Sequence, residues 1–190
     1  MATNGSKPYQ AQLIRAQGLA VPETLITDRP ELVLEFRRRH GRIVYKSISG
    51  IRSIVQTMRD EDEARLDRIR WCPTQFQAYV EGEDVRVHVI DGTVFATAID
   101  SNVTDYRYAG RTDGGEAVLR AVELEEEVTA RCVSLAAALG LAFAGIDLKV
   151  TPEGEVYCFE VNPCPAFSFY EQSTGQKISD ALAAWLAHRE

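Results

Sequence analysis

The sequence predicts an α+β fold that is built on antiparallel sheet. Two hairpin signals support this: Asp91-Gly92 separates two apolar runs, and Pro152-Glu153 separates two more. Strand and helix patterns alternate along the chain, but without the regular strand–helix–strand repeat of a parallel α/β fold. A chain of 190 residues can form one large domain or two small lobes with a real core.

Composition narrows the class of protein. The apolar fraction of 45% is ordinary for a soluble globular chain, and no apolar run approaches the roughly 20 residues that span a bilayer. The start, MATNGSKPYQ, lacks the apolar segment of a secretory signal, so we expect a cytoplasmic protein that does not contact membranes. The net charge of −7 argues against a nucleic-acid partner.

The first part of the chain shows two helix patterns and a short strand. Ser6 and Gly18 bound the first helix, and Asp28 with Glu31 resembles a capping box that opens the second. The basic run 37–40 closes that second helix, where it suits the helix dipole, so a phosphate patch is the weaker interpretation. In order, we expect a helix at 7–17, an extended piece at 21–27, a helix from 28 to 40 and a strand at 43–46.

The rest of the chain is mainly strand, with two more helices. We expect an exposed charged segment at 59–70, strands at 75–80, 85–90 and 93–100, a loop at 101–115, a helix at 124–139, a hairpin at 145–162 and a last helix at 177–188. The four cysteines form no CxxC pair or zinc pattern and are expected to be small buried apolar residues.

The hairpin at 145–162 is the most informative segment. If Thr151 faces Gly154, Asp147 lies opposite Cys158, and one face then holds Asp147, Cys158, Glu160 and Asn162. Lys149 lies nearby on the same side. Apolar side chains occupy the other face: Ile146, Leu148, Val150, Tyr157, Phe159 and Val161. In this register the two carboxylates are diagonal neighbours. A small set of oxygen ligands of this kind suits Mg²⁺. Ordinary solvent-facing residues of an antiparallel sheet would give the same pattern.

Three further polar groups are candidates for binding an anion. Lys46 ends a short strand before the turn SISG, whose backbone N–H groups could reach a phosphate, but no Walker motif is present. Asp84 and Arg86 share a strand face and could equally form an exposed ion pair. Arg107 follows in the loop after the next strand and could simply be solvated.

Taken in order, these segments resemble the C-terminal part of a RimK-like ATP-grasp ligase. The matching text is SKPYQAQLIRAQGLAVPETLIT, VYKSISG, TQFQAYVEGEDVRVHVIDGTVFATAI, DYR, AGIDLKV, CFEVNPCPAF and TGQKISDALAAWL. The nearest branch holds ribosomal-protein glutamate ligases and peptide-macrocyclising ligases. The resemblance implies two α+β lobes whose antiparallel sheets grip ATP, at residues 1–75 and 76–190, with the domain that usually precedes them absent.

The resemblance also implies a role for each candidate residue. Asp147, Glu160 and Asn162 would hold two Mg²⁺ ions, with Mn²⁺ as an alternative. Arg86 and Arg107 would face the γ-phosphate and the transferred group. The nucleotide would be bound by eight residues: Lys46, Ser49, Gly50, Gln77, Ala78, Tyr79, Val80 and Asp84. Within this set the backbone of 77–80 would read adenine, and Asp84 would lie near the ribose.

The implied reaction joins a carboxylate to an amine or a hydroxyl at the expense of ATP. An acyl phosphate would form first, releasing ADP, and would then be attacked with loss of phosphate. The expected substrates are amino acids, peptides or protein tails, and the relatives suggest a homodimer. Two alternatives stay open: an ATP-binding module that depends on a separate N-terminal domain or partner protein, and a phosphotransferase that stops at a phosphorylated product.

Overall fold

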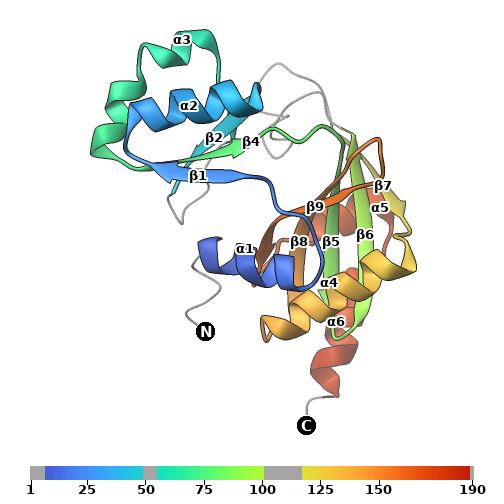
Figure 1. Cartoon of the computed structure of the whole chain (residues 1–190). Coiled ribbons are helices and arrows are strands. Elements are labelled where there is room, and N and C mark those ends of the chain that lie inside the picture. Colours follow the sequence, from blue (N-terminus) through green and yellow to red (C-terminus); the bar gives the residue numbers. More distant parts are fainter. Residues whose placement is uncertain (1–6, 49–54, 101–116, 189–190) are drawn as a thin grey trace. The chain divides into compact units, whose positions relative to one another are not determined.

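The computed structural model describes residues 7–48, 55–100 and 117–188, which form two compact units (Figure 1). The four-stranded unit holds residues 22–48 and 55–80. The five-stranded unit holds residues 7–21, 81–100 and 117–188. Both sheets are antiparallel throughout, as the hairpin signals predicted.

The four-stranded unit combines its sheet with two α-helices and a 3-10 helix. Its strand order is β1 (Thr24–Thr27), β4 (Thr74–Ala78), β2 (Ile43–Ser47) and β3 (Gln56–Thr57). The helical segments are α2 (Pro30–His40), α3 (Asp60–Glu63) and a 3-10 helix at Leu66–Trp71. Six buried side chains form its core: Val33, Phe36, Ile43, Met58, Leu66 and Phe76.

The start of α2 differs from the expected capping box at Asp28. The N-cap is Arg29, and the N–H of Arg29 donates to the Thr27 hydroxyl at 3.0 Å. Pro30 opens the helix, because its missing N–H and fixed φ suit the first turn. The prediction of a helix at this place is confirmed, but the capping residue was wrong.

The basic end of α2 is neutralised by acidic side chains of the same unit. Arg37 pairs with Asp60 and Glu63 at 2.5 Å each, and His40 lies 3.3 Å from Glu23. These partners favour the interpretation of the basic run 37–40 as an ordinary helix end and not as a phosphate-binding patch.

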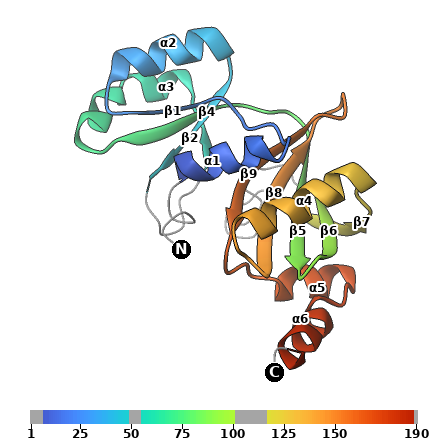
Figure 2. The same cartoon turned by 60° about the horizontal axis from the view of Figure 1, so that its bottom comes forward.

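The five-stranded unit is a sheet with helices on both faces (Figures 1 and 2). Its strand order is β7 (Val118–Val122), β6 (Thr93–Asp100), β5 (Glu83–Ile90), β8 (Phe143–Val150) and β9 (Val156–Asn162). Its helices are α1 (Lys7–Ala16), α4 (Glu126–Ala138), α5 (Ser168–Thr174) and α6 (Ile178–Ala187). β7 and α5 were not predicted from the sequence. The turn at Asp91-Gly92 has positive φ at both residues, as a two-residue hairpin requires.

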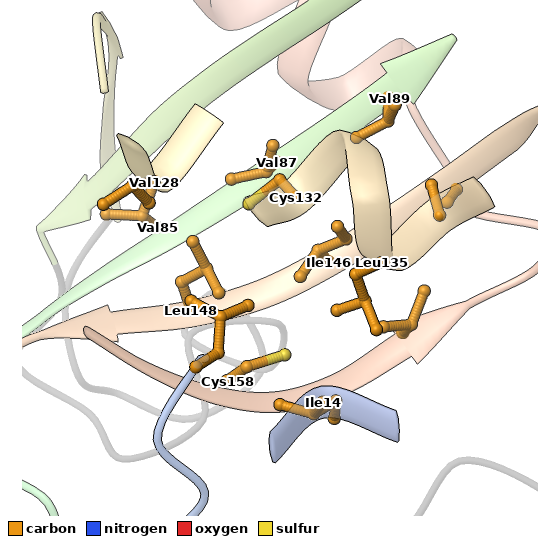
Figure 3. Close-up of a cluster of buried hydrophobic side chains, with 14 of the residues drawn as sticks. Ile14, Val85, Val87, Val89, Val128, Cys132, Leu135, Ile146, Leu148 and Cys158 are labelled. Atoms are coloured by element: carbon orange, nitrogen blue, oxygen red, sulfur yellow. The ribbon is translucent and has the colours of Figure 1, made fainter. Parts of the chain in front are cut away.

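The main core lies between one face of this sheet and the helices α1 and α4. Figure 3 shows Val128, Cys132 and Leu135 of α4 lying over the strands, with Ile14 of α1 beside Cys158. The side chains of Cys132 and Leu135 are completely buried. This dry face leaves the opposite face of β5, β8 and β9 for polar side chains.

The first helix belongs to the five-stranded unit. The Gln10 side chain binds both backbone groups of Val161, donating to its carbonyl at 2.8 Å and accepting from its N–H at 2.9 Å. The N–H of Cys158 donates to the Ala20 carbonyl at 2.8 Å. The predicted lobes, 1–75 and 76–190, place α1 in the N-terminal lobe, whereas the compact units place it with the five-stranded sheet.

The cysteines divide into two pairs. Cys132 and Cys158 are buried, and burial raises the pKa of the Cys132 thiol to about 12 and that of Cys158 well above its usual range, so both stay protonated. The expectation of buried cysteines is confirmed for these two and wrong for Cys72 and Cys164, which are exposed.

Within the described ranges no helix has the length and apolar character needed to cross a bilayer.

We predict that Leu135→Ala destabilises the fold by about 2–5 kcal/mol, because it leaves a cavity between α4 and the sheet. Leu186→Ala on α6 is the matched control, since its side chain is 57% exposed and its loss should change stability by only about 0.5 kcal/mol. Urea unfolding followed by circular dichroism measures both. Equal effects of the two substitutions would contradict this assignment of the core.

Candidate functional site

The β8–β9 hairpin has a different register from the one expected. Its tip is longer by one residue, because the Thr151 N–H donates to the Glu155 carbonyl at 2.9 Å, and Val150 pairs with Val156. Leu148 then pairs with Cys158, and Cys158 therefore faces the apolar core. The prediction that Cys158 shares the polar face was wrong.

A β-bulge returns Glu160 to the side of Asp147. The ladder shifts between Asp147 and Leu148, so that Phe159 is the extra residue and Asp147 pairs directly with Glu160. Val161, the next residue, is buried in the core beside Ile146. The two carboxylates are therefore direct cross-strand neighbours and not diagonal ones, which brings them closer than the sequence analysis predicted.

Asn162 lies beside both carboxylates. Its Nδ2 is 3.3 Å from Asp147 Oδ2 and 3.5 Å from Glu160 Oε1. Like charges directly opposite each other destabilise a sheet unless donors or a cation neutralise them. Two carboxylates and an amide are an oxygen donor set of the kind that Mg²⁺ binds, so the residues present fit this ion. No group of three His, Cys, Asp or Glu side chains suited to a metal occurs in the described ranges.

Charges alternate over the same face of the neighbouring strands. Arg86 of β5 pairs in register with Asp147 of β8 and forms an ion pair with it. One row away, Asp84 pairs in register with Lys149, and their charged atoms are 3.0 Å apart. The Arg86 side chain is buried, so its ion pair with Asp147 is largely shielded from water. It therefore differs from the exposed ion pair that was the alternative for Arg86 in the sequence.

His88 extends the same face into the covered part of the sheet. Its ring is fully buried against Tyr170, with ring centroids 5.0 Å apart, and its Nε2 is 3.1 Å from the Ala166 carbonyl. Burial, with a smaller effect from the nearby Arg86 charge, lowers the pKa of His88 from 6.5 to about 4. The neutral imidazole donates from Nε2 to the carbonyl, and among the described residues Nδ1 has no hydrogen-bond partner.

The chain passes from one compact unit to the other between Val80 and Glu81, three residues before Asp84. In the segment expected to read adenine, the N–H of Ala78 donates to the Glu23 carbonyl at 2.9 Å and that of Tyr79 to the Arg42 carbonyl at 3.0 Å. These two donors are engaged within the protein. Recognition of adenine through this segment would therefore use its carbonyl groups or the Val80 N–H.

Lys46 lies in the four-stranded unit, on the face of β2 that looks away from the apolar core. It pairs in register with Gln75, and Gln77 stands two residues along the same face. All three side chains are buried, which is rare for lysine. The Gln77 side chain donates to the Thr24 hydroxyl at 3.0 Å.

Three of the predicted residues lie outside the described ranges: Ser49, Gly50 and Arg107. The structure brings together Asp84, Arg86, Asp147, Glu160 and Asn162 on one face of one sheet. Lys46 and the segment from Gln77 to Val80 belong to the other unit.

Sequence reasoning missed His88 as a member of this face. It placed Lys149 on the side of Asp147, as the structure does, but it did not find the partner Asp84, because the pairing of β5 with β8 has no turn signal. His88 lies two residues after Arg86 in β5, and residues two apart in a strand share a face. Its position on this face could therefore have been predicted from the sequence.

The chain belongs to the RimK-like ATP-grasp domain family, which matches residues 6–186. The probable alpha-L-glutamate ligase of Xanthomonas oryzae pv. oryzae (strain MAFF 311018) is 29% identical over 192 residues, which cover 92% of this chain and 62% of that protein. The probable alpha-L-glutamate ligase of Enterobacter sp. (strain 638) is 27% identical, with 92% and 61% covered. The chain therefore spans about three fifths of these relatives.

Solved ATP-grasp ligases share the fold. PsnB, in complex with a phosphomimetic variant of its minimal precursor, Mg and ADP, has a TM-score of 0.85 at 32% identity, covering 98% of this chain and 59% of that one. The macrocyclase MdnC from Microcystis aeruginosa MRC, bound to the precursor peptide MdnA, has a TM-score of 0.84 at 26% identity, covering 97% and 61%. The predicted ATP-grasp fold is thus confirmed.

We predict that His88 makes the fold sensitive to acid. Because its pKa is lower in the folded state, its contribution is complete above pH 6.5 and is lost as the pH falls toward about 4. A shift of this size corresponds to about 3 kcal/mol at roughly 1.4 kcal/mol per pH unit.

Urea unfolding of the wild type and of His88→Gln at pH 7, 5.5 and 4.5 tests this prediction. The variant should lose less stability than the wild type on acidification. His188→Gln, at an exposed position, is the control and should follow the wild type. Identical pH dependence of the wild type and His88→Gln would rule out this role of His88.

Proposed function

We propose that the protein is an ATP- and Mg²⁺-dependent ligase that joins a carboxylate to an amine or a hydroxyl through an acyl phosphate. The observation that carries the proposal is the direct pairing of Asp147 with Glu160, with the Asn162 amide beside both. Two facing carboxylates with an amide beside them form a donor set that suits a divalent cation. Family membership supports ATP as the source of the phosphoryl group.

Asp147, Glu160 and Asn162 would hold two Mg²⁺ ions. Bound Mg²⁺ would supply neutralisation of phosphate charge during the transfer. The Asn162 amide can present either its nitrogen or its oxygen, and half a turn of the side chain would direct Oδ1 to a cation. The bulge supports this arrangement because it sets both carboxylates on one face while Cys158 and Val161 stay in the core.

The basic residues would stabilise the charge that moves during transfer. Arg86 is buried beside Asp147, where its planar guanidinium is suited to donate to phosphoryl or carboxylate oxygens. Lys46 would bind the ATP phosphates together with the backbone of Ser49 and Gly50, and Arg107 would contact the transferred group. Membership of the RimK-like ATP-grasp family supports these roles.

The nucleoside would be bound by residues 77–80 together with Asp84. The segment from Gln77 to Val80 would read adenine through its carbonyl groups or the Val80 N–H, since Ala78 and Tyr79 already use their N–H groups. Asp84 would accept from the ribose hydroxyls. Its partner Lys149, 3.0 Å away, would help to hold the Asp84 carboxylate in place.

The substrates we propose are an amino acid, a peptide or a protein tail as carboxylate, with an amine or a hydroxyl as acceptor. The named glutamate ligases and the complexes of PsnB and MdnC with precursor peptides support this class. No side-chain nucleophile is needed, because the acyl phosphate is attacked by the acceptor itself. The protein contributes positioning and charge stabilisation.

We predict that Glu160→Gln weakens Mg²⁺-dependent ATP binding by on the order of 10–100-fold, because it removes a charged ligand while keeping the shape of the side chain. Calorimetric titration of ATP with Mg²⁺, and again with EDTA, measures the effect. Glu155→Gln makes the same charge change in the same hairpin, where Glu155 accepts from the Tyr157 hydroxyl, and should bind like the wild type. An unchanged metal-dependent affinity in Glu160→Gln would refute the proposed site.

Release of ADP should depend on adding both a carboxylate and an amine or hydroxyl acceptor. We expect turnover with at least one pair drawn from glutamate, glutamate-ended peptides and acidic peptides with internal Lys, Ser or Thr. A coupled ADP assay with mass spectrometry of the product measures this. Tight Mg-ATP binding without turnover for any pair would favour the partner-dependent binding module, and a stable phosphorylated product would favour a phosphotransferase.

A further inference from the structure

Gly145 is present for a reason other than backbone conformation. The seven other glycines within the described ranges have positive φ values, which glycine adopts without strain. Gly145 instead lies inside the regular strand β8, paired with His88 on one side and Asn162 on the other. A glycine inside a strand weakens it and often marks a close approach by another group.

That group is the guanidinium of Arg86, together with Pro165. A Cβ atom at position 145 would lie 2.7 Å from Arg86 Nη2, 2.9 Å from Arg86 Cζ and 2.5 Å from Pro165 Cβ. These separations are shorter than any ordinary carbon contact. The space that a side chain would fill is therefore already taken by the arginine head group and the proline ring.

The remaining sides of this slot are also defined. The centroid of the Tyr170 ring is 5.6 Å from Arg86 Cζ, a distance typical of cation–π contact. Asp147, two residues along the same face of β8, forms an ion pair with the guanidinium. The Arg86 slot, meaning Gly145, Asp147, Pro165 and Tyr170 around the guanidinium, leaves Arg86 only 7% exposed.

We propose that Gly145 is a positioning residue that holds the Arg86 guanidinium flat against β8 beside Asp147. An arginine side chain has several rotatable bonds, and the direction in which it donates is fixed only when its plane is held. Because Gly145 has no side chain, the guanidinium plane can lie close to the backbone of β8. The effect of this positioning on ligation rests on the proposed function of Arg86. The existence of the slot does not depend on that function.

The slot can be tested on the full chain without any substrate, by NMR of ¹⁵N-labelled arginine. The Nε–H signal of Arg86, identified by its loss in Arg86→Lys, should exchange with solvent at least tenfold more slowly than that of the exposed Arg29. In Gly145→Ala the Arg86 signal should move, and its exchange should become at least tenfold faster. An unchanged signal and exchange rate in Gly145→Ala would overturn the proposal.

Gly154→Ala is the matched control in the same hairpin. Gly154 has a φ of +86° and no atom within 4 Å of its would-be Cβ, so alanine there strains the backbone without filling any space. This variant should lose stability but keep the wild-type Arg86 signal. If it changed the Arg86 signal as much as Gly145→Ala does, general loosening of the hairpin would explain both, and the slot would be rejected.

A variant that fails to fold also decides the question. If Gly145→Ala is unfolded, the triple variant Arg86→Ala/Gly145→Ala/Pro165→Gly should regain the folded state, because both clashing groups, the guanidinium and the proline ring, are gone. A triple variant that stays unfolded would overturn the proposal.

The consequence for catalysis is a separate arm of the experiment. Where the wild type turns over, Gly145→Ala should lower kcat at least tenfold with a smaller change in the KM for ATP, since the nucleoside contacts lie elsewhere; an unchanged kcat would overturn the catalytic consequence. Absence of turnover in the wild type would count against the proposed function, and the arginine signals would still decide on the slot.

Discussion

The mutual repulsion of Asp147 and Glu160 is the constraint on which the polar face of the five-stranded sheet depends. Two carboxylates that face each other across adjacent strands cost free energy unless positive charge or donors surround them. Each neighbour on this face meets that need: Arg86 pairs with Asp147, and the Asn162 amide donates to both carboxylates. The same face bears the Asp84–Lys149 pair one row away, so charges of opposite sign alternate along β5 and β8.

Such a face can be held only if the sheet beneath it is rigid. The opposite face supplies this, because it packs against α1 and α4 in a continuous apolar layer. Gln10 adds a polar anchor by binding both backbone groups of Val161, the residue between Glu160 and Asn162. A buried amide that satisfies both groups of one residue fixes the end of β9 where it would otherwise be an unpaired edge.

Much of this arrangement could be predicted from the sequence, because it depends on local pattern. Turn signals and alternation were enough for the antiparallel strands, and the spacing of Glu160 and Asn162 was enough to place them on one face. What failed was the register of β9. The longer tip moved the strand by one residue and the bulge at Phe159 moved it by one more, so the faces of Glu160 and Asn162 came out right while that of Cys158 did not. A bulge has no strong local signal in the sequence. This one lets Cys158 and Val161 pack in the core while Glu160, which lies between them, stays on the polar face.

The pairing of β5 with β8 is a second feature that the sequence could not supply, since more than fifty residues separate Arg86 from Asp147. It is also the feature that gives the glycine in AGIDLKV its meaning. In the sequence this glycine is only a weak point in a strand, but once β5 lies beside β8 it becomes the floor under a buried guanidinium.

Charge balance explains why a polar face of this composition suits the proposed ligand. Three carboxylates and two cations leave the described face with a small excess of negative charge. Two Mg²⁺ ions carry as much positive charge as fully ionised ATP carries negative charge, so loading both together would leave that balance unchanged. Either one alone would disturb it, which is a physical reason to expect the nucleotide and the metal to bind cooperatively. Arg86, held in its slot, would then be a fixed positive charge beside the phosphates and not a mobile counter-ion.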